Sequence, residues 1–117
     1  MTRLTVTVGG TLEDDLQAFV GAWHKAERGE TVADQVLAFE SWEALSSIMT
    51  GERLRLLRHL HAHPEPSVSA LARALGRQYR RVHDDVIALE IVGLVARADG
   101  TVRVTADTVT AEVKLAA

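Results

Sequence analysis

The sequence predicts an α+β fold, in which a winged helix-turn-helix follows an N-terminal strand–helix–strand extension. Three observations lead to this prediction. Alternating apolar residues near the N-terminus are typical of a strand, three short amphipathic helices follow one another in the middle, and an Asp-Gly dipeptide between two apolar runs is typical of a β-hairpin. We therefore expect a dimerisation or partner-binding extension over residues 1–49 and a winged helix-turn-helix over residues 50–117.

The extension begins with a predicted strand, in which Leu4, Val6 and Val8 alternate with threonines. Gly9-Gly10 ends this strand, and Thr11 is expected to cap a helix over residues 11–28. The apolar stripe of that helix is Leu12, Leu16, Phe19, Val20 and Trp23. Residues 36–39 predict a short buried strand, and Ser41 is expected to cap a short helix that carries Trp42, Leu45, Ile48 and Met49.

The central helices are predicted from their caps and their apolar spacing. Thr50 and Ser67 are expected to cap the first two helices, and Gly76 is expected to end the second with a left-handed residue. A third helix then places Tyr79, Val82, Val86 and Leu89 on its inward face. Gly93 ends this helix, and residues 94–98 and 101–105 flank the hairpin turn at Asp99-Gly100.

The last segment predicts a half-buried strand, because Val109, Ala111, Val113 and Leu115 alternate with polar residues. The two terminal strands, around Val6 and Val113, have edges that need partners. These edges can pair within one chain or between two chains, and the sequence leaves both alternatives open.

Composition limits the class of protein. A chain of 117 residues with 47% hydrophobic and 25% charged residues suits one globular domain with a short extension rather than a disordered protein. The absence of cysteine excludes disulfides and cysteine-ligated zinc. No apolar run approaches the length of a bilayer span, and Met1-Thr2-Arg3-Leu4 contains no signal-peptide core. We therefore expect a cytoplasmic protein.

The charge is unevenly distributed, although its net value is only −3. Residues 1–40 hold three basic and seven acidic side chains, whereas residues 50–83 hold seven arginines against Glu52 and Glu65. The N-terminal part of the chain is thus acidic, and its central part is basic. Eleven of the 13 basic residues are arginine, which suits phosphate and base recognition and is equally typical of a GC-rich genome.

The third central helix is the predicted DNA-reading element, because a helix fits the major groove and its outward side chains reach base edges. Its outward set is Gln78, Arg80, Arg81, Asp84 and Asp85, with His83 at the margin. Arg80 and Arg81 are candidates for hydrogen bonds to guanine or to phosphate, and Gln78 is a candidate for hydrogen bonds to adenine. Ser69 and Arg77 are expected to contact phosphate, and Arg97 and Arg103 on the wing are expected to contact the DNA backbone. Tyr79 either contacts DNA or lies in the core of the domain.

The two carboxylates on this face argue against tight DNA contact, because they repel phosphate, although one of them suits cytosine N4. A tri-helical core with a hairpin also occurs in modules that only bind proteins. We therefore keep a second hypothesis, in which the protein neutralises a partner through its acidic N-terminal part without specific DNA binding.

Residues 71–86, with the sequence LARALGRQYRRVHDDV, together with Leu89-Glu90 and Gly93-Leu94-Val95, resemble the MarR-like winged-helix regulators. The N-terminal part, with Phe19-Val20, Trp23 and Phe39-Glu40-Ser41, is similar to the subfamily that often supplies the antitoxin of a toxin–antitoxin pair. The resemblance implies a homodimer that binds a roughly palindromic operator in double-stranded DNA and represses its own operon. It also implies that residues 77–81 and His83 begin the recognition helix. Asp84 departs from the pattern, in which a basic residue is common.

The sequence gives little support for metal binding or catalysis. His59 and His63 are four residues apart and could face one metal ion, but no third ligand has a convincing spacing. We interpret them as solvated residues near a helix C-terminus. The sequence contains no phosphate-binding glycine loop and no catalytic signature of serine, histidine and acid. We therefore expect no enzyme activity, no metal and no cofactor.

Overall fold

The computed structural model describes residues 3–8, 34–113 and 115. The predicted helix over residues 11–28 lies outside them. The chain divides into two compact units, the first formed by Met1–Ser46 with Ala106–Ala117 and the second by Ser47–Thr105. The last segment therefore groups with the N-terminal unit, whereas the sequence predicts that it belongs to the winged helix-turn-helix over residues 50–117.

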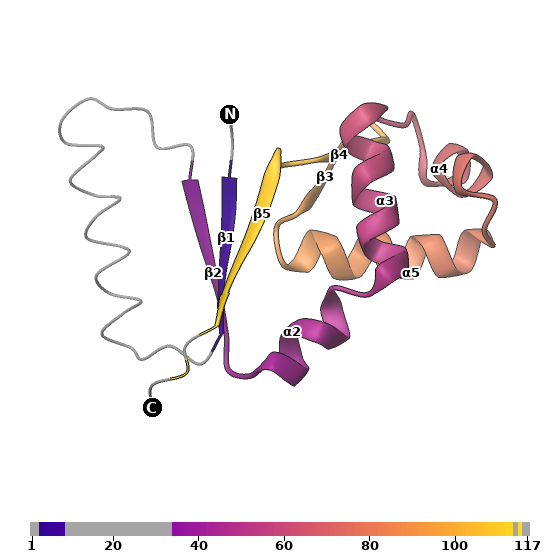
Figure 1. Ribbon diagram of the computed structural model, residues 1–117. Helices are drawn as coiled ribbons and strands as arrows, with labels where there is room; N and C mark the ends of the chain where they lie inside the picture. Colours follow the sequence, from indigo (N-terminus) through magenta and orange to yellow (C-terminus); the bar gives the residue numbers. More distant parts are fainter. Residues whose placement is uncertain (1–2, 9–33, 114, 116–117) are drawn as a thin grey trace, which may run out of the picture. The chain divides into compact units, whose positions relative to one another are not determined.

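The described elements confirm the predicted α+β class (Figure 1). In chain order they are β1 (Arg3–Val8), β2 (Asp34–Phe39), α2 (Trp42–Ile48), α3 (Gly51–Ala62), α4 (Val68–Leu75), α5 (Tyr79–Ile91), β3 (Val95–Ala98), β4 (Thr101–Val104) and β5 (Thr108–Val113).

The first unit contains a parallel sheet with the strand order β2-β1-β5. In its register Leu4 lies opposite Val109, and Val6 lies opposite Ala111. The two terminal strands of the chain thus pair with each other inside one chain. In the central strand β1, the alternate residues Leu4, Val6 and Val8 are buried.

β5 differs from the prediction of a half-buried strand, because all six of its residues are exposed. The alternation of apolar residues correctly predicts the strand, but burial depends on what covers its face. As an edge strand, β5 has only β1 beside it among the described residues.

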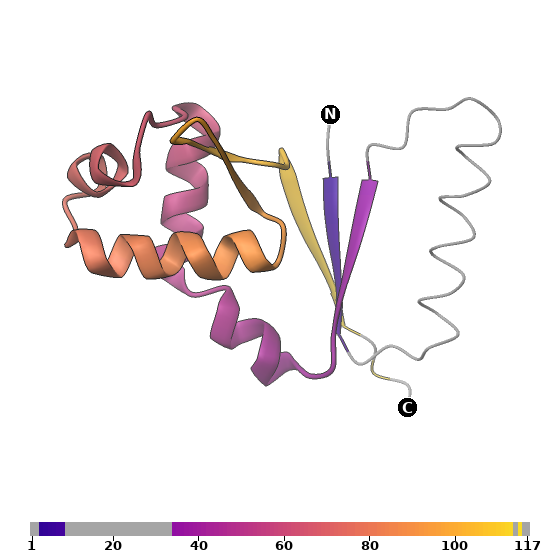
Figure 2. The ribbon, with the colours of Figure 1, turned by 180° about the vertical axis from the view of Figure 1, so that it is seen from behind.

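The second unit has the winged-helix arrangement, in which α3, α4 and α5 are followed by the antiparallel hairpin of β3 and β4 (Figure 2). Its most deeply buried side chains come from α3, α4, α5, β4 and the turn before β3: Leu56, Leu60, Leu71, Val82, Val86, Leu89, Leu94 and Val102. The backbone of Glu65, between α3 and α4, forms a β-bridge with Val102 and so ties the hairpin to the helices.

Local signals in the sequence account for the helix ends. The side chains of Ser41, Thr50 and Ser67 each accept a hydrogen bond from a backbone N–H three residues later. Gly76 has φ +66°, the left-handed conformation that ends α4, and both residues of the hairpin turn at Asp99-Gly100 have positive φ. None of the described helices has the length and apolar character of a membrane span.

Candidate nucleic-acid interface

The turn between α4 and α5 is short and closely hydrogen-bonded. The backbone N–H of Gly76 donates to Arg73 O at 3.2 Å, and that of Arg77 donates to Ala72 O at 3.1 Å. These bonds satisfy carbonyls at the end of α4. Gln78 precedes α5, and its side chain makes no capping hydrogen bond.

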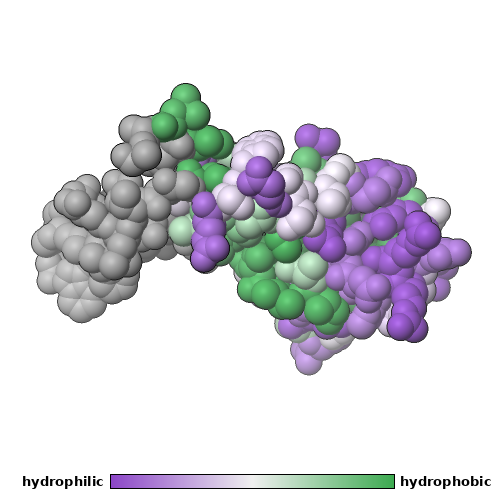
Figure 3. Space-filling view, turned by 90° about the horizontal axis from the view of Figure 1, so that it is seen from below, coloured by the Kyte–Doolittle hydropathy of each residue, from purple (hydrophilic) through white to green (hydrophobic). Residues whose placement is uncertain are grey.

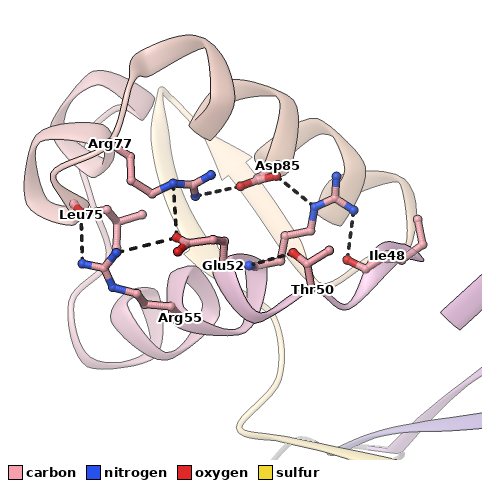
Figure 4. A network of polar contacts seen from close by, with 8 residues as sticks. Ile48, Thr50, Glu52, Arg55, Leu75, Arg77 and Asp85 are labelled. Atoms are coloured by element: carbon pink, nitrogen blue, oxygen red, sulfur yellow. Dashed lines mark hydrogen bonds and ion pairs between the residues drawn. The ribbon is translucent and has the colours of Figure 1, made fainter. Parts of the chain in front are cut away.

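A network of ion pairs holds α5 against α3 (Figure 4). Asp85, in the middle of α5, accepts a hydrogen bond from Arg53 Nε at 3.0 Å on one carboxylate oxygen and from Arg77 Nη1 at 2.8 Å on the other. Arg77 Nε also lies 3.3 Å from Glu52 Oε2. The two arginines come from α3 and from the turn, so Asp85 joins both to the third helix of the motif.

The network also reaches two other helix ends. Arg53 Nη1 donates to the carbonyl oxygens of Ser47 and Ile48, at the C-terminus of α2. Arg55 Nη2 donates to Leu75 O at 3.1 Å, at the C-terminus of α4. Guanidinium groups therefore bind carbonyls that have no partner inside their own helices.

Asp85 does not point outward, which corrects the prediction from the helical pattern. Its side chain is only 13% exposed. The physical reason is its position on the helix, three residues after the buried Val82 and four before the buried Leu89, which places it at the border of the buried stripe. Since two guanidinium groups bind its carboxylate, the expected repulsion of phosphate by this residue loses its basis.

Arg77, predicted as a phosphate contact, is half-buried, and its guanidinium binds Asp85 and Glu52. Arg80 and Arg81, in the first turn of α5, are exposed and make no hydrogen bond or ion pair within the part of the chain that the structure describes. The outward face of α5 thus offers two uncompensated guanidinium groups. Gln78, just before them, is also exposed.

Tyr79 is 52% exposed, so its predicted place on the inward face of the helix is wrong and the alternative of a surface position is correct. It is the first residue of α5 and lies one turn before Val82, where the buried stripe begins. Its ring stacks on that of His83, with centroids 5.8 Å apart and planes 29° apart.

Asp84 is the acidic residue that remains on the outward face, with 70% of its side chain exposed. His83 Nδ1 lies 3.8 Å from its Oδ1. The departure from the basic residue that the MarR-like pattern carries therefore concerns a side chain that solvent reaches.

A hollow of about 350 Å³ lies between α4 and the start of α5. The residues that line it are Ser69, Ala72, Arg73, Gly76, Arg77 and Tyr79. It brings together three of the predicted site residues, Ser69, Arg77 and Tyr79. It also adds Arg73, which the sequence analysis did not select, although the four-residue spacing from Ser69 places both on one face of α4.

The wing carries Arg97 on β3 and Arg103 on β4, so the two lie on opposite strands as predicted. Arg97 Nη2 lies 2.7 Å from Glu90 Oε1 on α5, and this ion pair links the β3–β4 hairpin to α5. Arg103 is exposed and makes no hydrogen bond or ion pair with the described residues.

The second unit is basic, with nine arginines and six carboxylates in Ser47–Thr105, a net charge of +3. Arg53, Arg55, Arg77 and Arg97 form ion pairs. The exposed arginines that make no ion pair among the described residues are Arg58, Arg73, Arg80, Arg81 and Arg103. Figure 3 shows hydrophilic side chains gathered over the end of this unit that holds α4 and the start of α5.

Of the histidines near the end of α3, His59 contacts an acidic side chain. His59 Nε2 lies 2.8 Å from Glu65 Oε1, and the rings of His59 and His63 are 6.1 Å apart. Within the described ranges, no group of three histidine or acidic side chains is placed to hold a metal ion.

The comparisons with known proteins place the chain in a family. The family model named HVO_A0114 matches residues 48–111, more than half of the chain, and so covers the second unit and most of β5. Searches of the curated proteins and of the solved structures gave no match. The chain belongs to the HVO_A0114 family.

Proposed function

We propose that this protein is a sequence-specific DNA-binding transcriptional regulator that represses its own operon, with α5 as the recognition helix. The observation that carries the proposal is the outward face at the start of α5, where Arg80 and Arg81 are exposed without an ion-pair partner among the described residues. Arginine is the side chain that most often reads guanine in the major groove, through two parallel hydrogen bonds.

The ion pairs around Asp85 support this role by fixing the position of α5. A recognition helix must hold its side chains in register with the bases, and a helix fixed at two points along its length achieves this without reorganisation on binding. Asp85 binds the middle of α5 to Arg77, and Glu90 binds its last turn to Arg97. These pairs leave Arg80 and Arg81, in the first turn of α5, available for DNA.

The hollow beside α4 and the wing supply the expected backbone contacts. Arg73 and Ser69 flank the start of α5, and Arg103 extends from β4. Guanidinium and hydroxyl groups at such positions bind phosphate oxygens, which set the register and most of the affinity but carry no sequence information directly.

The experiment that tests this function is an anisotropy titration of the purified protein against its own upstream DNA and a scrambled duplex of equal length, at two salt concentrations. We expect tighter binding to the upstream DNA, and an affinity that falls steeply with salt because bound arginines release counterions. Equal and weak binding to both duplexes would overturn the proposal.

The finer resemblance to MarR-like antitoxins belongs to the same proposal. In that form the acidic N-terminal part, including residues 11–28, would bind a toxin protein in the cytoplasm while the second unit binds DNA. Deletion of residues 1–40 is a poor test, because it removes β1 and β2 from the sheet that β5 completes. Exchange of Glu13, Asp14 and Asp15 for the neutral amides keeps these strands, and unchanged toxin neutralisation would contradict this role.

A further inference from the structure

β5 presents an open edge. It is the last strand of the sheet β2-β1-β5, and on the side away from β1 no strand pairs with it in the part of the chain that the structure describes. Its six residues are all exposed. Such an edge offers a row of backbone N–H and C=O groups to another strand.

The sequence of this edge carries few of the features that protect edge strands from pairing, and its one charged side chain is Glu112. The segment Thr108–Val113 reads TVTAEV, with four β-branched residues, no proline and no lysine. Proteins normally blunt an exposed edge with proline, lysine, a bulge or a very short strand. Because β5 has full length and none of these residues, its edge is suited to form a ladder.

The register of the sheet identifies which residues of β5 share a face. Val109, Ala111 and Val113 lie opposite Leu4, Val6 and Val8 of β1, so the three belong to the apolar face of the sheet. Thr110 and Glu112 belong to the other, polar face. A partner strand that extends the sheet must match both faces, because the side chains of strands alternate with a period of two.

A second copy of β5 meets this requirement. In an antiparallel pair with a two-fold axis at Ala111, Val109 faces Val113 of the partner subunit, and Thr110 faces Glu112 of the partner subunit. Apolar residues then meet apolar ones and polar residues meet polar ones. A shift of the register by one residue sets Val109 against Glu112 of the partner subunit and mismatches both faces.

We propose that the protein forms a homodimer by antiparallel pairing of β5 with β5 of a second copy, about an axis at Ala111. The two parallel sheets become one continuous sheet. The dimer carries two winged-helix units, which suits a palindromic operator, but the pairing itself does not depend on DNA binding.

Single cysteines test the axis directly, because the chain has no cysteine of its own. Residues on the axis face each other with Cα atoms about 4.5–5.5 Å apart, which lies within disulfide range. In the Ala111→Cys protein we therefore expect rapid formation of a disulfide-linked dimer under mild oxidation. The matched control is Thr110→Cys, whose Cα atoms lie about 7–8 Å apart across the axis, too far for a bridge.

The outcomes separate the alternatives. A cross-link at residue 111 without one at residue 110 supports the proposal. Preferential cross-linking at residue 110 overturns the axis at Ala111, and failure of both proteins to cross-link overturns β5 pairing, leaving another surface such as the β2 edge for any dimer.

A charged substitution at the axis tests the association without a cross-linking reaction. Ala111→Lys places two ammonium groups against each other at the axis, so the dissociation constant of the dimer should rise at least about fivefold in sedimentation equilibrium. Thr110→Lys adds the same charge one residue away, where it faces Glu112 of the partner subunit, and should leave the dimer intact. A monomeric wild-type protein at micromolar concentration, or equal weakening by both lysines, would contradict the proposal whatever the result of the DNA titration.

Discussion

Arg77 Nη1 donates a hydrogen bond to Asp85 Oδ2 across 2.8 Å, and this pair joins the turn after α4 to the middle of α5. Since Arg53 binds the other oxygen of the same carboxylate, α3, the turn and α5 meet at one residue. The geometry of the helix-turn-helix therefore rests on charged contacts at the border of the core as well as on buried leucines and valines.

Asp85→Ala should destabilise the protein by about 2–3 kcal/mol, because it leaves the half-buried guanidinium of Arg53 without a carboxylate and that of Arg77 with Glu52 alone. Denaturant unfolding followed by circular dichroism measures the free energy of unfolding. The control is Asp84→Ala on the same helix, whose side chain is largely exposed and whose loss should change stability by no more than about 0.5 kcal/mol. Equal effects of the two substitutions would show that the network contributes nothing.

Arg80→Ala or Arg81→Ala should weaken binding to the upstream DNA by about 1–3 kcal/mol if the residue reads a base. The free energy of unfolding should stay unchanged, because neither side chain bonds to a described residue. Anisotropy titration gives the affinity. Arg58→Ala removes the same charge from an exposed position on α3, and an equal loss there would mean that only net charge matters.

Arg103→Ala on the wing should weaken binding equally on upstream and scrambled DNA, since a phosphate contact carries no sequence information. The slope of log affinity against log salt should become shallower by about one. Titrations at four salt concentrations measure that slope. A loss confined to the upstream DNA would instead indicate base contact by the wing.

Gly76→Ala should cost about 1–2 kcal/mol, because an L-residue disfavours the left-handed conformation at φ +66°. An added Cβ at Gly76 or at Gly51 meets no atom within 4 Å, so a steric clash does not distinguish the two positions. Gly51→Ala, at the start of α3 where φ is ordinary, is therefore the control and should be neutral or stabilising. Thermal unfolding of both variants checks the difference, and similar losses would assign the effect to something other than φ.

Most element boundaries could be predicted because local chemistry sets them. Thr50 and Ser67 cap their helices through bonds to backbone groups three residues away, and Asp99-Gly100 forms its turn through its own backbone conformation. The candidate site was predicted less completely. Arg80, Arg81 and Arg103 are exposed as expected. Tyr79, predicted to face the core, is exposed, and Asp85, predicted to face outward, is largely buried. Helical spacing alone does not locate the ends and borders of a buried stripe.

The sequence by itself determined the order of the elements, the caps, the glycine turns and the basic character of the middle of the chain, because each depends on residues close together in sequence. Only the tertiary structure decided that β5 pairs with β1, that Arg53 and Arg77 converge on Asp85, and that Arg97 is bound to Glu90. These contacts join residues far apart along the chain or on different elements. Their formation depends on which elements the folded core brings together, and no local pattern contains that information.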